Sequence, residues 1–250
     1  MDHAQEQRTP DPAIRLGGAC IIAGSLAVLA FRMAHGDLPA ADPDAALRFI
    51  AEHPLYAGVH LGTILGVLGW VGGFITLSRT LDDGVARVLG RLGTASMLVG
   101  AAIFIVEHSI DGVAGQDLAT AWATAAPAGQ ADLVLAAQTA FTMLRGTSLV
   151  SIITLWGLPL VLFGLAAMTE RYPAWLAWTG MVVGAVTTLA AMALLLQPDI
   201  FPGVLLYGVL VSVVVQLWSL GVGIATYRRK PSAAANDPSA VEPAGSPRVA

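Results

Sequence analysis

Charged residues are scarce in this sequence. Asp, Glu, Lys and Arg make up 12% of its 250 residues, whereas soluble globular domains average about 25%. Hydrophobic residues make up 56%, and a soluble fold of this length could not bury so much apolar surface. The composition therefore argues against an ordinary soluble domain and makes a lipid bilayer the expected solvent.

Cysteine is also scarce. Cys20 is the single cysteine, so an intramolecular disulfide and a Cys-x-x-Cys-His haem attachment are excluded. The sequence has no His-Glu-x-x-His motif and no glycine-rich phosphate loop after a strand. It has no basic patch for nucleic acid. A Ser-His-Asp triad would need Ser109, but its neighbour His108 faces a different way in a helix, so this chemistry is disfavoured.

Six apolar runs are long enough to cross a bilayer, which takes about 20 helical residues. They cover 16–34, 57–78, 92–110, 147–168, 174–196 and 203–227. We therefore predict an all-α fold, a bundle of six transmembrane helices over 16–227. Residues 1–15 form an N-terminal segment, and 228–250, rich in Pro, Ala and Ser, are expected to be a disordered tail. The first run is expected to be retained, since "FRMAHGD" is a poor signal-peptide cleavage site.

Basic residues gather on one side of the predicted spans. Of the 13 Lys and Arg residues, only Arg32, Arg48 and Arg145 fall on the side opposite the N-terminus. Loops rich in Lys and Arg stay in the cytoplasm. Both termini are therefore expected to be cytoplasmic, and the other side is called external below.

The first two external loops are each expected to carry a short interfacial helix. In the first loop, Ala46, Phe49 and Ile50 recur at helical spacing after Asp42 and Asp44, which are capable of capping a helix. In the second loop, residues 130–146 form an amphipathic pattern of about four turns, too short and too polar to cross. This helix would lie on the membrane or dip into it.

Small residues are expected to pack the spans together, because helices in lipid associate through close contact. The small-residue faces are Gly58, Gly62, Gly66, Gly69 and Gly73 in the second span, Gly180, Gly184 and Ala191 in the fifth, and Gly208, Ser212, Gln216, Ser219 and Gly223 in the sixth. We place Gln138 and Gln216 in an intramembrane polar seam, with Gln216 hydrogen-bonded across a helix interface. A substrate path along the sixth helix is the alternative.

Three ionisable residues, Glu107, His108 and Asp111, end the third apolar run. In a helix, Glu107 and Asp111 continue the packing face and lie four residues apart, where like charges repel unless a cation intervenes. Arg145 is the preferred partner, because its guanidinium matches a carboxylate. We therefore predict a structural ion pair of Arg145 with Glu107 or Asp111.

Histidines gather at the external helix ends, where His35, His53, His60 and His108 all lie. Imidazole and carboxylate groups ligate Zn, Mn and Fe, so His60, Glu107, His108 and Asp111 are candidate metal ligands. Two histidines at equal depth on antiparallel helices could also hold a haem. A structural role at the membrane interface is the leading interpretation.

Two stretches resemble a known family. The stretch "DPDAALRFIAEHPLYAGVHLGTILGVLGWVGGFITLSRTL" joins an acidic loop, a short amphipathic helix and a long apolar helix ending in a basic turn. The stretch "LWGLPLVLFGLAAMTERYPAWLAWTGMVVGA" joins a small-residue helix, a charged turn and an aromatic-Pro-x-Trp-Leu entry to the next span. Over roughly 14–227 the chain is similar to a family of bacterial multi-pass membrane proteins, catalogued as domain of unknown function 4386. The resemblance implies a fold and an inner-membrane location, and no activity.

Three functions are open at this point. The first is a non-enzymatic multi-pass inner-membrane protein whose external cluster holds the bundle together, partnered by lipid and, as a homo-oligomer or complex subunit, by other chains. The second is a redox protein that binds a divalent metal or a haem through His60, Glu107, His108 and Asp111. The third is a small proton-coupled transporter that uses Glu107 and Asp111 against Arg145.

Overall fold

A computed structural model describes residues 11–81, 84–170 and 172–229. The predicted N-terminal segment up to residue 10 and the predicted tail from residue 230 lie outside this part. The described residues form helices and no strands. Six of their helical spans are long and apolar enough to cross a membrane. The predicted all-α six-helix bundle is therefore confirmed.

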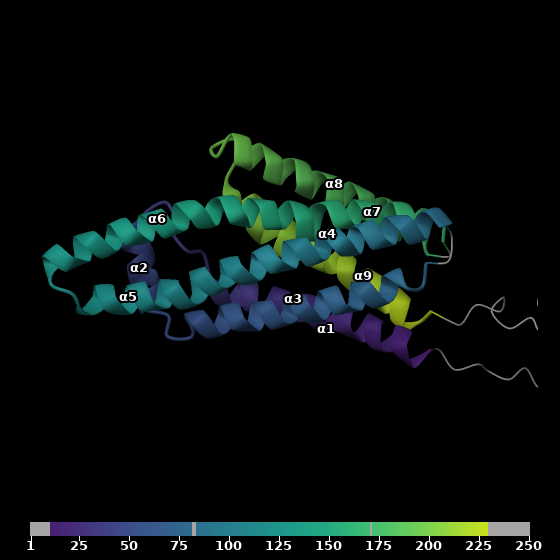
Figure 1. Cartoon of the computed structure of the whole chain (residues 1–250), viewed down its shortest axis with the longest axis horizontal. Helices are drawn as coiled ribbons and strands as arrows, with labels where there is room; N and C mark the ends of the chain where they lie inside the picture. The colour runs from purple at the N-terminus through teal and green to yellow at the C-terminus, as the bar shows by residue number, and fades with distance from the viewer. Residues whose placement is uncertain (1–10, 82–83, 171, 230–250) are drawn as a thin grey trace, which may run out of the picture.

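The six spans differ in construction (Figure 1). The first, second and fifth are single α-helices, α1 (Pro12–His35), α3 (Tyr56–Ser78) and α8 (Ala174–Leu196). The third joins α4 (Gly84–Ser109), the π-helix η1 (Ile110–Ala114) and α5 (Gly115–Thr124). The fourth joins α6 (Pro127–Ser151), the π-helix η2 (Ile152–Gly157) and α7 (Leu158–Met168). The sixth joins the π-helix η3 (Leu205–Val215) and α9 (Gln216–Tyr227), and the short α2 (Pro43–Ala51) lies between the first two spans.

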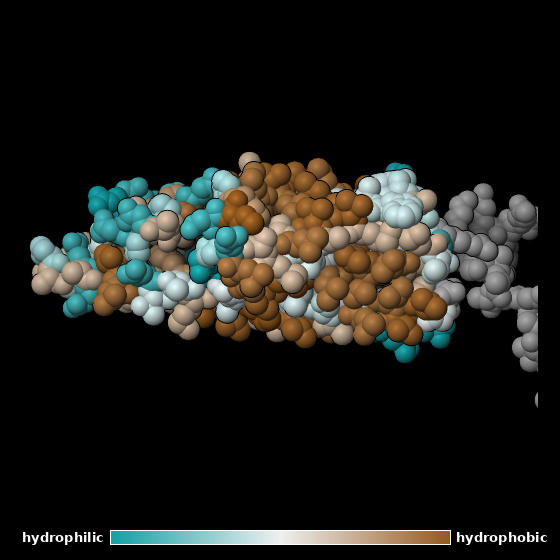
Figure 2. Space-filling model, turned by 90° about the horizontal axis from the view of Figure 1, so that it is seen from above, coloured by the Kyte–Doolittle hydropathy of each residue, from teal (hydrophilic) through white to brown (hydrophobic). Residues whose placement is uncertain are grey.

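The third and fourth spans are longer than a bilayer requires. They contain 41 and 42 residues, or about 60 Å of helix at 1.5 Å per residue, against about 30 Å of hydrocarbon. Their excess length consists of α5 and residues 127–141 of α6. Together with α2 it forms one end of the molecule, which we call the head (Figure 1). Figure 2 shows that this end is hydrophilic and that the middle of the molecule is hydrophobic.

The head has a small core of its own. Ala46, Leu47 and Ile50 of α2 are buried together with Ala119 of α5 and Ala137 of α6. The predicted helix in the first external loop is therefore present as α2. The predicted separate short helix over 130–146 is wrong, because these residues continue into the fourth span. Their apolar side packs against α2 and α5, so it does not need a membrane surface to cover it.

Small residues hold the bundle together, as predicted. A Cβ atom built on Gly24 of α1 would lie 2.6 Å from the carbonyl oxygen of Gly66 on α3. A Cβ atom on Gly184 of α8 would lie 2.7 Å from the carbonyl oxygen of Gly157. Gly58 is an exception, since a Cβ atom there would have no neighbour within 4 Å. The main chains of α1 and α3 therefore approach closely at Gly66 and Gly73 of the predicted glycine face, whereas Gly62 accommodates the Phe31 ring.

The predicted polar seam includes Gln216, which is buried within the sixth span, but it does not include Gln138. Gln138 is exposed on the head, because its neighbour Ala137 takes the buried side of α6. Gln216 is fully buried, but its Nε2 atom donates to the carbonyl oxygen of Val211 in its own span, at 3.2 Å. The π-helical turn brings a carbonyl five residues back within reach of this side chain, so no bond across a helix interface forms through Nε2.

Both described chain ends lie at the end opposite the head, which we call the tail end (Figure 1). There Arg229 donates to Thr80 Oγ1 at 2.7 Å and to the Tyr172 hydroxyl at 3.0 Å. It also pairs with Glu170, whose side chain is 8% exposed, at 3.4 Å. Arg229, in the predicted disordered tail, is thus held against two other segments of the chain, the end of the second span and the connection between α7 and α8.

Candidate metal centre

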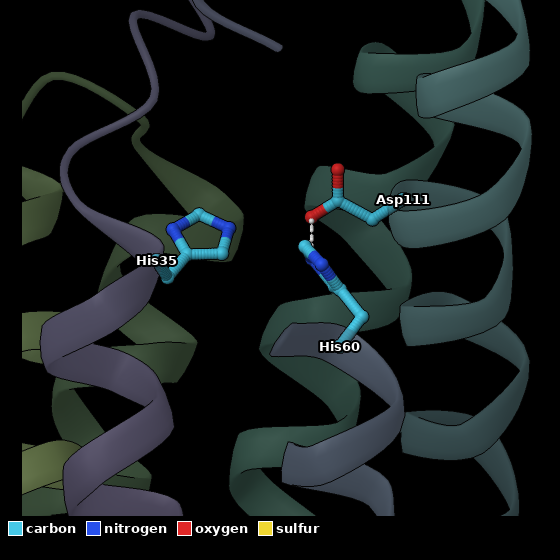
Figure 3. Close-up of side chains that lie close together, drawn as sticks. All are labelled: His35, His60 and Asp111. Atoms are coloured by element: carbon cyan, nitrogen blue, oxygen red, sulfur yellow. Dashed lines mark hydrogen bonds and ion pairs between the residues drawn. The ribbon is translucent and has the colours of Figure 1, made fainter. Parts of the chain in front are cut away.

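Side chains from three elements meet where the bundle joins the head. His35 ends α1, Tyr56 and His60 lie in the first two turns of α3, and Asp111 lies on η1. One potential ligand atom from each of His35, His60 and Asp111 lies within 4.8 Å of the other two. Figure 3 shows His35 on one side and the His60–Asp111 pair on the other. We call His35, His60 and Asp111 the triad.

The Asp111 carboxylate is bound through both oxygens. Its Oδ2 atom lies 3.1 Å from His60 Nε2, and its Oδ1 atom accepts a hydrogen bond from the Tyr56 hydroxyl at 3.0 Å. Tyr56 and His60 are four residues apart and therefore share one face of α3. His60 is buried, whereas the Asp111 side chain is 22% exposed, so the contact is reached by solvent from the Asp111 side.

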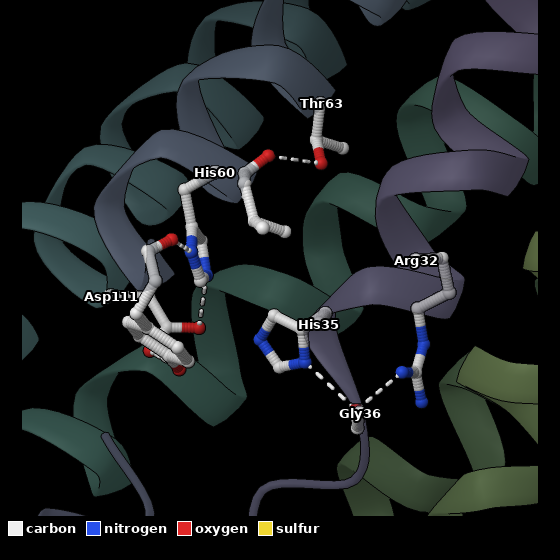
Figure 4. A network of polar contacts seen from close by, with 8 residues as sticks. Arg32, His35, Gly36, His60, Thr63 and Asp111 are labelled. Atoms are coloured by element: carbon white, nitrogen blue, oxygen red, sulfur yellow. Dashed lines mark hydrogen bonds and ion pairs between the residues drawn. The ribbon is translucent and has the colours of Figure 1, made fainter. Parts of the chain in front are cut away.

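The two histidines are oriented by main-chain carbonyls. His60 Nδ1 lies 2.9 Å from the carbonyl oxygen of Tyr56, and His35 Nδ1 lies 2.9 Å from that of Gly36 (Figure 4). A carbonyl oxygen only accepts hydrogen bonds, so each Nδ1 carries the hydrogen and the neutral ring has its lone pair on Nε2. Metal-ligating histidines are commonly held in this way.

The position after His35, occupied by Gly36, requires a main-chain conformation that favours glycine. Its φ of 70° lies in the left-handed region that favours glycine, and this conformation ends α1. Its carbonyl oxygen accepts a hydrogen bond from Arg32 at 2.6 Å in addition to the contact with His35. The last turn of α1 and the residue after it therefore fix the orientation of the His35 ring.

A proton or a cation is required between His60 and Asp111. Because His60 Nδ1 already donates to a carbonyl, the contact of Nε2 with Oδ2 needs a hydrogen on one of the two atoms. A metal ion can replace that hydrogen and bind both atoms, since metal binding to histidine and carboxylate displaces protons. Two neutral imidazoles and one carboxylate carry one negative charge, which a divalent cation would more than neutralise.

Glu107 and His108 are not part of the triad, although the sequence predicted them as ligands together with His60 and Asp111. The Glu107 carboxylate accepts a hydrogen bond from Ser151 at 3.1 Å. His108 stacks on Phe104 at a centroid distance of 3.6 Å. The ligand atoms of Glu107 and His108 are absent from the metal-sized group that the described residues form.

The two carboxylates bond to different neighbours, Glu107 to Ser151 of α6 and Asp111 to His60 and Tyr56 of α3. Asp111 lies in the π-helix η1, and a π turn contains more residues than an α turn, so α-helical periodicity does not describe how Asp111 follows Glu107. The metal-sized group does not contain Glu107 or His108, and it contains His35, which the sequence did not predict as a ligand. The signal for it was present in the sequence, since His35 and His60 both lie at the external ends of neighbouring spans.

His108 nevertheless lies beside the triad. Its ring centroid is 5.3 Å from that of His60, and its buried Nδ1 atom has no hydrogen-bond partner among the described residues. An unpaired buried polar atom costs free energy. A water molecule bound near the triad would be able to satisfy it.

The predicted ion pair of Arg145 is wrong. Arg145 is exposed on α6 and makes no ion pair in the described part of the chain. Asp111 is bound by His60 and Tyr56, and Glu107 by Ser151. Burying the guanidinium would require its desolvation, whereas the exposed side chain keeps its hydration.

A haem does not fit between His35 and His60. Their ring centroids are 4.9 Å apart in a T-shaped contact. Two imidazoles that ligate one haem iron lie on opposite faces of the macrocycle, and rings already in contact leave no room for it. The geometry favours a bare metal ion over a haem.

Comparisons with models of protein families, with curated proteins and with solved structures gave no match. The resemblance to the family of domain of unknown function 4386 therefore stays a prediction. The six apolar helical spans indicate a multi-pass membrane protein. Its more specific function has to be argued from the triad.

Proposed function

We propose that this membrane protein binds one divalent transition-metal ion through His35 Nε2, His60 Nε2 and Asp111 Oδ2. The observation that carries the proposal is the convergence of these three ligand groups within 4.8 Å from three separate elements. The carbonyl contacts of both Nδ1 atoms and the Tyr56 hydrogen bond to Oδ1 support it. They orient the ligands, and the metal would take the place of the hydrogen between His60 Nε2 and Asp111 Oδ2.

The ligand set indicates the kind of metal. Imidazole nitrogens suit Zn, Fe, Cu and Ni, whereas Ca²⁺ and Mg²⁺ prefer oxygen ligands alone. Metal–nitrogen bonds are about 2.0 Å long, so the side chains would move slightly closer on binding. Three protein ligands leave a coordination position open for water or a further ligand, as in catalytic zinc sites.

The orientation in the membrane is part of the proposal. Arg32, Arg48 and Arg145 lie on the head side of the chain. The basic residues Arg15, Arg79, Arg87, Arg91, Arg228 and Arg229 flank the tail ends of the spans. By the positive-inside rule, the head would face the external side of a bacterial inner membrane and both termini the cytoplasm. The metal would then reach the triad from the external side.

The test is metal binding by the purified full-length protein in mild detergent. After treatment with a chelator and its removal, the protein is titrated with Zn²⁺ by calorimetry, and bound zinc is measured by mass spectrometry. We expect one zinc per chain, and an affinity lowered at least about tenfold in His35→Ala, His60→Ala and Asp111→Asn. His53→Ala is the matched control, because His53 contacts Phe49 and lies outside the triad.

Two results would overturn the proposal. One is a wild-type protein that binds no stoichiometric metal. The other is equal zinc binding by the triad variants and by His53→Ala. In either case the His60–Asp111 pair would serve only to hold α3 against η1, which is the structural role that the sequence favoured.

A further inference from the structure

The first and sixth spans touch near the tail end and diverge toward the head. A Cβ atom built on Gly18 of α1 would lie 2.6 Å from the main-chain nitrogen of Tyr227. Near the head, a Cβ atom on Gly208 of η3 would have its nearest α1 atom, Nη2 of Arg32, at 3.8 Å. A groove of about 290 Å³ lies between α1 and η3 where they diverge.

The groove is mostly apolar along its length, with Ser212 as the exception, and polar at one end. Its apolar lining consists of Leu29 and Met33 from α1 and Val204, Val209 and Val213 from the sixth span. Met33 is 77% exposed and Val209 is 50% exposed, so the groove opens on the membrane-facing side of the bundle. It has room for part of a hydrocarbon chain, but not for another helix.

Arg32 supplies a positive charge at the polar end. Its Nη1 atom donates to Gly36 and its Nη2 atom to Asp37, at 2.8 Å. The Asp37 side chain is 78% exposed, so this ion pair is weak and Asp37 can turn into water. A guanidinium has five N–H donors and binds phosphate well through two of them.

We propose that the groove between α1 and η3 binds one anionic phospholipid. Its phosphate pairs with Arg32 in place of Asp37, and an acyl chain lies along Leu29, Met33 and Val209. The positive charge of Arg32 suits a phosphate. Arg32 lies in the last turn of α1, where the apolar part of the span ends, and this is the depth at which a phospholipid headgroup lies. The proposal does not depend on a metal at the triad.

The test is native mass spectrometry of the full-length protein, stripped of lipid and held in mild detergent. It is titrated separately with dioleoyl phosphatidylglycerol and dioleoyl phosphatidylcholine, and glycerol phosphate is added as a competitor of phosphatidylglycerol. We expect one phosphatidylglycerol per chain, bound about fivefold more tightly than phosphatidylcholine, as one cation near anionic lipid supplies. Glycerol phosphate, which lacks the chains, should not compete.

Three variants locate the site. Arg32→Gln should abolish the preference for phosphatidylglycerol. Val209→Trp, at an exposed position on the groove wall, should weaken binding of both phospholipids without touching Arg32. Arg48→Gln is the matched control, because Arg48 is also an exposed arginine on the head side, paired with Asp44, and it should bind as the wild type does.

Several results would overturn the lipid site. Binding that is unchanged in both Arg32→Gln and Val209→Trp would mean general lipid association. Equal competition by glycerol phosphate would mean an anion site without a chain. A dimer that Val209→Trp dissociates would mean that a second copy covers the groove. Unchanged melting temperatures of the variants would show that each measurement reports on folded protein.

Discussion

Gly112 lies directly against His60. A Cβ atom built on Gly112 would lie 2.6 Å from the Cβ atom of His60 and 2.8 Å from its Cγ atom. The absence of a side chain therefore lets η1 approach α3 closely. Asp111, the neighbour of Gly112, reaches the His60 ring only because of this approach.

Gly112→Ala is expected to weaken the triad. The new methyl group must displace either η1 or His60, and overpacking of this kind costs about 1–3 kcal/mol. We expect the apparent melting temperature to fall and zinc affinity to fall at least about tenfold. Gly146→Ala is the matched control on α6, since a Cβ atom there meets nothing within 4 Å. Equal zinc affinity in the two variants would mean that the Gly112 contact does not position Asp111.

Tyr56→Phe is expected to lower metal affinity while the fold persists. The substitution keeps the ring, which is packed in the head core, but removes the hydroxyl that donates to Asp111 Oδ1. Loss of a group that orients a ligand costs about 10–100-fold in affinity, and calorimetric titration with Zn²⁺ measures this directly. Tyr227→Phe, at the tail end, should bind zinc like the wild type. Wild-type affinity in Tyr56→Phe would show that Asp111 needs no support from this hydroxyl.

Ser151→Ala is expected to destabilise the bundle, and Arg145→Ala is not. Ser151 donates to the buried Glu107 carboxylate, which Ser148 also contacts, and loss of one hydrogen bond costs about 0.5–1.5 kcal/mol. Arg145 is exposed, and surface substitutions usually stay within about 0.5 kcal/mol. Thermal unfolding in detergent compares the two. A larger loss of thermal stability in Arg145→Ala than in Ser151→Ala would support the ion pair that the sequence predicted.

Arg229→Gln is expected to loosen the tail end. The guanidinium joins α9 to Thr80, Tyr172 and Glu170, and removal of one partner of a buried pair costs about 3–5 kcal/mol. The loss should lie at the lower end, because Arg229 is 20% exposed. Arg228→Gln, one residue earlier and exposed, is the control. Melting curves that coincide for the two variants would mean that the Arg229 contacts contribute nothing to stability.

The six spans and many of their packing faces follow from the sequence alone. Length and hydropathy are local properties, and in lipid every main-chain polar group must be satisfied within the helix. A run of about 20 apolar residues therefore becomes a spanning helix whatever its neighbours do. The glycine face around Gly66 is equally local, since it depends only on helical periodicity.

The composition of the triad was decided by the tertiary structure. His60 and Asp111 are 51 residues apart in the chain, and whether they meet depends on how α3 and the third span are rotated and shifted against each other. Helical periodicity assigned Glu107 and Asp111 to one face, whereas in the structure Glu107 bonds to α6 and Asp111, in the π-helix η1, bonds to α3. No single residue in the sequence indicates a π turn. The positions of His35 in the triad and of Arg145 in solvent also depend on how the helices pack against one another. Local pattern fixes the face of one helix, whereas the meeting of faces depends on all the contacts of the bundle together.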